Sequence, residues 1–152
     1  MNQRVGNVCG RNVVTVAPGT SVAEAAALMR KHHVGTVVIV EDQAGAQVPT
    51  GIVTDRDIVV VVVAAGLDAS ALAVGEIVQR PLVTITSEAT CSQVVREMSI
   101  QGVRRLPVVN ADGTLAGIVA LDDVLLDLVA PLVAVGDLAN RERSFELHTR
   151  TA

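Results

Sequence analysis

Residues 51–68 read GIVTDRDIVVVVVAAGLD, in which the polar cluster TDRD (54–57) leads directly into Ile58 and five consecutive valines. As a helix, the apolar run from Ile58 to Ala65 would be about 12 Å long at about 1.5 Å per residue, against about 30 Å for a bilayer's hydrocarbon core. The run is therefore too short to cross a membrane. It is either a strand or a helix, and the rest of the chain decides between them.

The composition indicates a buried sheet covered by helices. Half of the 152 residues are hydrophobic, mostly Val, Ala, Leu and Ile, with one Phe and neither Tyr nor Trp, and such β-branched richness favours strands buried on both faces. A net charge of −4 and the lack of stacking rings argue against a nucleic-acid partner. The first residues, MNQRVGNVCGR, lack the apolar stretch of a signal peptide, so we expect a soluble, cytoplasmic protein.

Cysteines and histidines do not form a metal pattern. Cys9 and Cys91 have no metal-ligand spacing and are expected to be reduced, partly buried thiols. His32 and His33 are adjacent, so on a helix they would point about 100° apart. We therefore expect no metal site. No nucleophile–base pattern is visible either, so we expect no enzyme.

The chain contains an internal repeat. VGNVCGRNVVTV (5–16) matches VGEIVQRPLVTI (74–85) at an offset of 69, and TGIVTDRDIVV (50–60) matches AGIVALDDVLL (116–126) at an offset of 66. The first repeat thus carries three extra residues, which we place in the loop EDQAGAQVPT (41–50). We expect one repeat at 1–68, a second at 69–130, and a helical, partly disordered tail at 131–152.

Each repeat has the pattern β-α-β-β-α. An extended piece (12–16 or 81–85) precedes a helix, which in the first repeat covers 22–32 with Ser21 or Thr20 as its cap and Glu24 in its first turn. Two strands follow, at 36–42 and 51–54 or at 105–110 and 116–120. NADG (110–113) is a hairpin signal, and the last helix begins at Asp57 or Asp123.

The repeat favours a helix for the valine run. Its counterpart, VLLDLVA (124–130), is rich in leucine and interrupted by Asp127, which is typical of a helix. Each valine costs a few tenths of a kcal/mol in a helix relative to alanine, whereas burying one recovers roughly 1.5 kcal/mol. A helix at 58–65 is therefore expected if it is covered on most sides. A fifth strand is the alternative.

The polar cluster lies between a strand ending at Val53 and this helix. Asp55 and Asp57 can act as helix caps, because the first turn has free N–H groups and a positive dipole end. Capping explains one aspartate but not Thr54 together with Asp57, which at this spacing should project into one crevice. A carboxylate there can accept hydrogen bonds from both hydroxyls of a ribose but would repel a phosphate.

The repeated unit ending in GIVTDRDI resembles a tandem pair of cystathionine-β-synthase (CBS) domains, the Bateman module. The resemblance covers Val5 to Ala130 and is closest to small stand-alone bacterial CBS-pair proteins of the hypoxic-response type. It implies an α/β (α+β) fold of two repeats packed through their sheets about a pseudo-twofold axis. It also implies regulatory binding of an adenine nucleotide (AMP, ADP or ATP) or a related adenosyl ligand such as NAD or S-adenosylmethionine, without catalysis.

The family's ribose-binding pattern, Gly-x-x-Thr-x-x-Asp, is complete in the first repeat as Gly51, Thr54 and Asp57. In the second repeat the matching residues are Gly117, Ala120 and Asp123, so the threonine hydroxyl is missing.

The stretch GVRRLPVV is similar to the His-Arg-Leu-Pro-Val stretch of the nucleotide-sensing subunit of AMP-activated kinases. The match implies that Arg104 and Arg105 bind phosphate; the alternative is two exposed strand arginines. RPLVTI resembles the segment that holds adenine, which implies Leu82 and Val83. One cleft would join these four residues with Thr54 and Asp57. The other would combine Asp123 with three uncharged residues, Val13, Val14 and Thr36, and is expected to be weak or empty.

The family also implies a homodimer, paired face to face through its helices, with the valine helix at the interface. A structural or interaction module with empty clefts, working by dimer or partner contacts, is the alternative function.

Overall fold

The computed structural model describes residues 3–126 and 129, so the tail predicted at 131–152 lies outside the described residues. The first repeat contains β1 (Thr15–Val16), α2 (Val22–His32), β2 (Thr36–Gln43), β3 (Ala46–Thr54), α3 (Asp55–Asp57) and the helix η1 (Ile58–Val63). The second contains β4 (Ile85–Thr86), α4 (Cys91–Gln101), β5 (Arg105–Val109), β6 (Leu115–Ala120) and a helix over 121–126. The predicted order β-α-β-β-α is therefore confirmed in both repeats. A short helix precedes the strands of each repeat: α1 (Val5–Val8) comes before β1, and η2 (Val74–Glu76) comes before β4.

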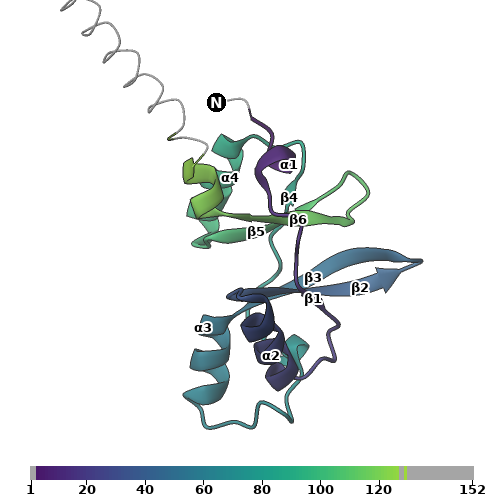
Figure 1. Ribbon diagram of the computed structural model, residues 1–152, viewed down its shortest axis with the longest axis vertical. Helices are drawn as coiled ribbons and strands as arrows, with labels where there is room; N and C mark the ends of the chain where they lie inside the picture. Colours follow the sequence, from purple (N-terminus) through teal and green to yellow (C-terminus); the bar gives the residue numbers. More distant parts are fainter. Residues whose placement is uncertain (1–2, 127–128, 130–152) are drawn as a thin grey trace, which may run out of the picture.

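The strands form two three-stranded sheets, in the orders β1-β2-β3 and β4-β5-β6. In each sheet the first two strands are parallel and the last two antiparallel. Figure 1 shows the two sheets facing each other in the middle of the molecule, with α2 and α3 outside the first sheet and α4 outside the second. The paired arrangement expected from the repeats is thus present.

Both faces of each sheet are covered, which explains the apolar strands. In β2, Val37 and Ile39 belong to the core beneath α2 and η1. Val38 is 0% exposed but does not belong to that core. Because side chains alternate along a strand, it lies on the opposite face of β2, the face toward the second sheet. In β5, Leu106 and Val108 pack on the helix side of their own sheet. Each sheet is therefore a cover for the other, and the continuous apolar runs reflect burial on two sides.

The repeats also exchange the segments that precede them. Val5, at the start of α1, is fully buried in the core of the second repeat, where its N–H donates to Ala89 O at 2.8 Å. Val74, at the start of η2, is fully buried in the core of the first repeat, and its N–H donates to Thr20 O at 2.8 Å. Packing therefore crosses the predicted boundary between residues 68 and 69.

The three extra residues of the first repeat lengthen a hairpin rather than a loop. β3 begins at Ala46 and pairs with β2 out to Gln43, so the predicted loop 41–50 is wrong for most of its length. Ala44 and Gly45 make the turn with φ angles of 57° and 86°, and Gly45 N–H donates to Asp42 Oδ1 at 2.7 Å. Such left-handed turns match the twist of paired strands, and a bulge between Ile39 and Val40 absorbs the change of register.

The valine run is a helix, so the strand alternative is wrong. The helix begins at Asp55, two residues before the predicted start. Its backbone widens to π geometry over Ile58–Val63, and Ala64 N–H donates to Val59 O, five residues earlier, at 2.9 Å. Ile58 and Val62 are buried, but Val59, Val60 and Val63 are 56%, 55% and 64% exposed. Within one chain the helix is covered on one side only, so burial on most sides, the condition under which the sequence predicted a helix, is not met within the chain.

The helices α2 and α4 both begin with a side-chain cap but differ in the residue that follows their last turn. Of the two predicted caps, Ser21 and Thr20, it is Ser21 that caps α2: Glu24 N–H donates to Ser21 Oγ at 3.2 Å, and Ser21 N–H donates to Glu24 Oε2 at 3.1 Å. At the other end, the left-handed residue after α4 is Gly102, with φ 64°, whereas the one after α2 is His33, with φ 54°. A side chain in that conformation is strained, and glycine is not.

We therefore predict that His33→Gly stabilises the protein by about 0.5–1 kcal/mol, the relief of strain being partly offset by the greater freedom of glycine in the unfolded chain. Gly102→His is the matched reverse change and should destabilise by a similar amount. Thermal unfolding of both variants beside the parent measures the two effects. A lower melting temperature for His33→Gly would contradict the assignment of strain to this residue.

Candidate functional site

Thr54 and Asp57 are joined in a reciprocal helix cap. Thr54 N–H and the Thr54 hydroxyl donate to Asp57 Oδ2 at 2.8 and 2.6 Å, and Asp57 N–H donates back to Thr54 Oγ1 at 3.2 Å. This arrangement is a capping box, which needs a hydroxyl and a carboxylate three residues apart. Capping therefore explains Thr54 and Asp57 together. The expectation that capping could explain only one aspartate is wrong.

The cap leaves one carboxylate oxygen available. All the hydrogen bonds that Asp57 accepts within residues 3–126 and 129 go to Oδ2, so Oδ1 of this half-buried side chain can accept from a ligand. Because the cap fixes the carboxylate at the end of β3, that oxygen is held in place before any ligand arrives. The geometry suits an acceptor for ribose hydroxyls.

The second repeat keeps only half of this arrangement. Ala120 N–H donates to Asp123 Oδ2 at 2.9 Å, but Ala120 has no hydroxyl to close the box. Asp123 is therefore held by one hydrogen bond where Asp57 has two. That the second cleft is weak or empty stays a prediction.

The glycine of each pattern lies against a segment of the other repeat. A Cβ on Gly51 would be 3.3 Å from Val78 Cγ2, on the segment that leads to Leu82 and Val83. A Cβ on Gly117 would be 2.8 Å from Cys9 Sγ, on the segment that leads to Val13 and Val14. At Gly117 the Cβ would also lie 2.7 Å from Gly10 O, a backbone atom, so glycine is required there; at Gly51 the contact is tight, and the neighbouring side chains would have to give by a few tenths of an ångström. They support the predicted pairing of each Gly-x-x-x-x-x-Asp pattern with the half-buried valines or leucine of the opposite repeat.

The two glycine contacts differ in how tightly they are closed. Gly10 and Ile118 exchange backbone hydrogen bonds of 2.9 and 3.0 Å beside Gly117. The equivalent residues beside Gly51 form no such bridge in the described part of the chain. Burial also raises the pKa of the Cys9 thiol above its ordinary value, so the thiol stays protonated where it fills the slot over Gly117. The second cleft is therefore the more closed at this end.

The predicted phosphate ligands lie at the start of β5. Arg104 and Arg105 are both exposed, and Arg104 Nη2 lies 3.7 Å from Asp122 Oδ1, with both side chains more than 70% exposed. An ion pair so exposed contributes little to stability, so the guanidinium can turn to a ligand. The expectation that these arginines meet phosphate is not tested by the geometry and stays a prediction.

Thr36, predicted for the second cleft, is 7% exposed and pairs with Thr54 across β2 and β3. Its Oγ1 is buried without a hydrogen-bond partner among the residues that the structure describes. An unpaired buried hydroxyl costs about 1–3 kcal/mol. Sequence reasoning treated Thr36 only as an uncharged substitute for arginine and missed this feature, which depends on the strand register.

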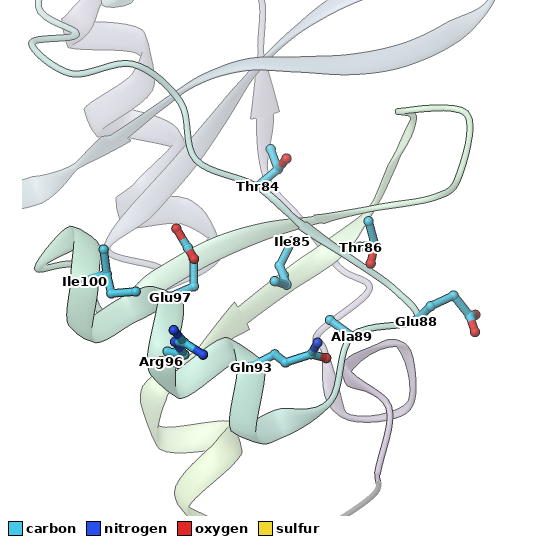
Figure 2. Close-up of a pocket in the computed structure, with 9 residues that line it drawn as sticks. All are labelled: Thr84, Ile85, Thr86, Glu88, Ala89, Gln93, Arg96, Glu97 and Ile100. Atoms are coloured by element: carbon cyan, nitrogen blue, oxygen red, sulfur yellow. The ribbon is translucent and has the colours of Figure 1, made fainter.

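Two hollows lie away from the predicted site residues. One of about 590 Å³ runs between β4 and α4, with Ile85 and Ala89 along it and Arg96 and Glu97 on the helix side, as Figure 2 shows. Another, of about 460 Å³, lies between the N-terminal segment and the second sheet and includes Cys9 and Arg11. Neither of these two hollows is lined by a predicted site residue.

Two further findings concern metals and membranes. Among residues 3–126 and 129, no three His, Cys, Asp or Glu side chains gather where they could hold a metal ion. None of the helices in the described part of the chain has the length and apolar character of a membrane span.

The comparisons with known proteins agree with the repeats and the fold. The CBS domain family profile matches residues 5–64 and 74–130, which covers most of the chain. The chain therefore belongs to the CBS domain family and carries two copies of the domain, as the sequence predicted.

Two curated proteins are similar to most of the chain. The chain is 34% identical over 128 residues to the CBS domain-containing protein YhcV of Bacillus subtilis, covering 84% of this chain and 87% of that one. It is 37% identical over 121 residues to an uncharacterized protein of Methanopyrus kandleri, covering 80% of this chain but only 60% of that one. The latter protein is thus considerably longer than the shared part.

Solved structures share the fold. Hypoxic Response Protein I, solved with two coordinated zinc ions, matches with a TM-score of 0.71 and 29% identity over 81% of this chain and 97% of that one. A CBS domain protein of Pyrobaculum aerophilum complexed with AMP matches with a TM-score of 0.74 and 24% identity over 84% of this chain and 99% of that one.

Proposed function

We propose that this CBS pair is a regulatory module that binds an adenine nucleotide in the cleft formed by Thr54, Asp57, Leu82, Val83, Arg104 and Arg105. The carrying observation is the Asp57 carboxylate, fixed through Oδ2 by the cap while Oδ1 stays available for a ribose. Arg104 and Arg105 are the cations proposed for the phosphates, since the guanidinium fork matches phosphate oxygens. AMP, ADP and ATP each have a ribose for Asp57 and at least one phosphate for Arg104 and Arg105.

The fold itself is compatible with such a ligand, because the Pyrobaculum aerophilum protein with AMP has the same architecture. At 24% identity that likeness says nothing about individual residues. The residue assignment here depends on this chain's own cap, glycine contact and exposed arginines. We assign no catalytic role to the cleft, since one carboxylate and two arginines suit binding.

The ligand assignment predicts different losses for two changes. Asp57→Ala should weaken AMP and adenosine alike by roughly one to two decades, because a hydrogen bond to a charged group contributes about 1.5–3 kcal/mol. Removing Arg104 and Arg105 together should weaken AMP by a comparable factor and leave adenosine nearly unchanged, because adenosine has no phosphate. Calorimetric titration of both ligands measures this, with Arg30→Ala as a control at an exposed arginine outside the cleft.

Equal loss of AMP and adenosine in the double arginine variant would mean that the arginines support the fold. The phosphate assignment would then be dropped. Absence of any binding by the parent would favour the alternative function, a structural or interaction module with empty clefts.

We further propose that the module works as a homodimer through its helices. The exposed valines of η1 are continued by Leu67, which is 50% exposed, and the second repeat exposes Ile100, Leu125 and Leu126 at 64%, 46% and 72%. Apolar side chains gathered on both helical layers are costly in water and indicate an association surface. A ligand would regulate by binding one arrangement of the dimer better than another.

The dimer predicts opposite outcomes for two neighbouring valines. Val63→Asp places a charge on the exposed side of η1 and should separate the dimer into folded monomers. Val62→Asp places it at a site that is 1% exposed and should cost several kcal/mol of stability, because the charge would be buried unpaired. Sedimentation and thermal unfolding distinguish the two effects. A Val63→Asp variant that stays dimeric would show that this face is not the interface.

A further inference from the structure

A short sequence pattern occurs three times in the chain, although the chain has two repeats. Residues 4–11 (RVGNVCGR) include α1, and residues 73–80 (AVGEIVQR) include η2. Residues 134–141, outside the described part of the chain, read AVGDLANR. This octapeptide shares Ala, Val, Gly and Arg with residues 73–80 and has Asp, Leu, Ala and Asn where they have Glu, Ile, Val and Gln. We call the three octapeptides leader segments, and one of them is surplus to the two repeats.

The structure explains why the pattern begins with Val-Gly. Val5 and Val74 are both fully buried, each in the core of one repeat. The glycine that follows donates its N–H at 3.0 Å to Ser87 O or to Pro18 O, and a Cβ on it would lie 3.0 or 3.1 Å from that same oxygen. A larger residue would therefore press on its own hydrogen-bond acceptor. The Val-Gly pair of the third leader segment meets both requirements.

The leader segment on the second repeat fits less closely than the one on the first. On the first repeat, Ala73 N–H donates to Glu76 Oε2 at 2.7 Å, and Ile77 is 4% exposed in the core. On the second, no side chain among the described residues caps α1, Val8 is half-buried, and the hollow of about 460 Å³ lies beside the segment. The third leader segment has Asp and Leu at the two places held by Glu76 and Ile77. It therefore resembles the segment that fits better.

The third leader segment also has the place in the chain that suits the second repeat. In the first repeat the last helix ends at Val63, and the leader segment that begins ten residues later, at Ala73, packs back on the same repeat. In the second repeat the described part of the last helix reaches Leu126, and Ala134 follows eight residues later. Eight extended residues span up to about 29 Å, which is about the diameter of a small domain.

We propose that residues 134–141 bind to the second repeat in place of residues 4–11, so that two leader segments compete for one slot. The slot is the site that holds Val5, with Ala89 O and Ser87 O as acceptors. Both acceptors bind backbone N–H groups, so a second segment with the same Val-Gly pattern can satisfy them equally well. The inference does not rest on the proposed ligand.

Two contacts favour residues 4–11 in this competition. Arg4 forms an ion pair with Glu88, but both side chains are more than half exposed, so the pair contributes little. Gly10 and Ile118 exchange two backbone hydrogen bonds. Binding of the third leader segment would break these two bonds beside Gly117 and open the second cleft at the end that they close. The exchange of leader segments is therefore a means of regulating access to that cleft.

The test is a double-mutant cycle in the full chain. Val5→Asp should lower the melting temperature by no more than about 4 °C, because residues 134–141 then fill the slot. Val135→Asp should lower it less, because residues 4–11 remain in place. The two changes together should lower it by at least about twice the sum of the single shifts, because every leader segment available to the slot then carries a charge that would be buried unpaired.

Two controls separate the slot from the charge. Phe145→Asp changes an apolar residue outside the octapeptide and should add nothing to the shift of Val5→Asp. Val74→Asp damages the slot of the first repeat, and its shift should be the same with and without Val135→Asp. Additive shifts of Val5→Asp and Val135→Asp overturn the proposal. A Val5→Asp protein that unfolds as completely as the double variant overturns it as well.

A second measurement needs no change in either core. The amides of Val5 and Gly6 are protected from hydrogen exchange only while residues 4–11 occupy the slot. Their exchange should be at least about threefold slower in Val135→Asp than in the parent, because the competing segment is removed. Phe145→Asp should leave the rates as they are in the parent. Equal rates in the parent and in Val135→Asp overturn the competition between leader segments.

Discussion

Each sheet of this protein has helices on one side only, so its other side must be buried against something, and each sheet serves that purpose for the other. Val38 in the first sheet is completely buried yet lies outside the core beneath the helices. Neither repeat can therefore bury its strands alone. The exchange of Val5 and Val74 between the two cores strengthens the same dependence, and the pair folds as one unit.

That constraint also creates the candidate site. Packing two sheets face to face brings the segment before each repeat past the glycine of the other, and the strand-to-helix junction of each repeat opens at the edge of the contact. The reciprocal cap at this junction serves the helix and the site together. Thr54 and Asp57 satisfy the first turn through Oδ2, so the carboxylate is oriented without help from a ligand. The cap uses Oδ2, and the recognition that we propose would use the other oxygen, Oδ1.

The repeats have the same backbone but different chemistry. Asp55 N–H donates to Gly35 O in the first repeat and Leu121 N–H donates to Arg104 O in the second, so the two backbones match closely. The side chains at matched positions differ: Thr54 has a hydroxyl that Ala120 lacks, and Gly35 stands where the second repeat has Arg104. The helical faces differ as well, since the valine helix is widened to π geometry where the second repeat has an α-helix. A duplicated frame can thus hold two unlike clefts and two unlike surfaces.

The sequence by itself determined the repeats, the element order, the span of α2 and its Ser21 cap, because these depend on local spacing and hydrogen bonds between near neighbours. Through its resemblance to the CBS family it also predicted a ribose-binding pattern at Gly51, Thr54 and Asp57. Only the tertiary structure decided the length of the β2–β3 hairpin, the one-sided burial of the valine helix, the unpaired Thr36 hydroxyl and the contact of Asp55 with Gly35. Each of these depends on strand register or on residues far apart in the chain, which no local pattern encodes.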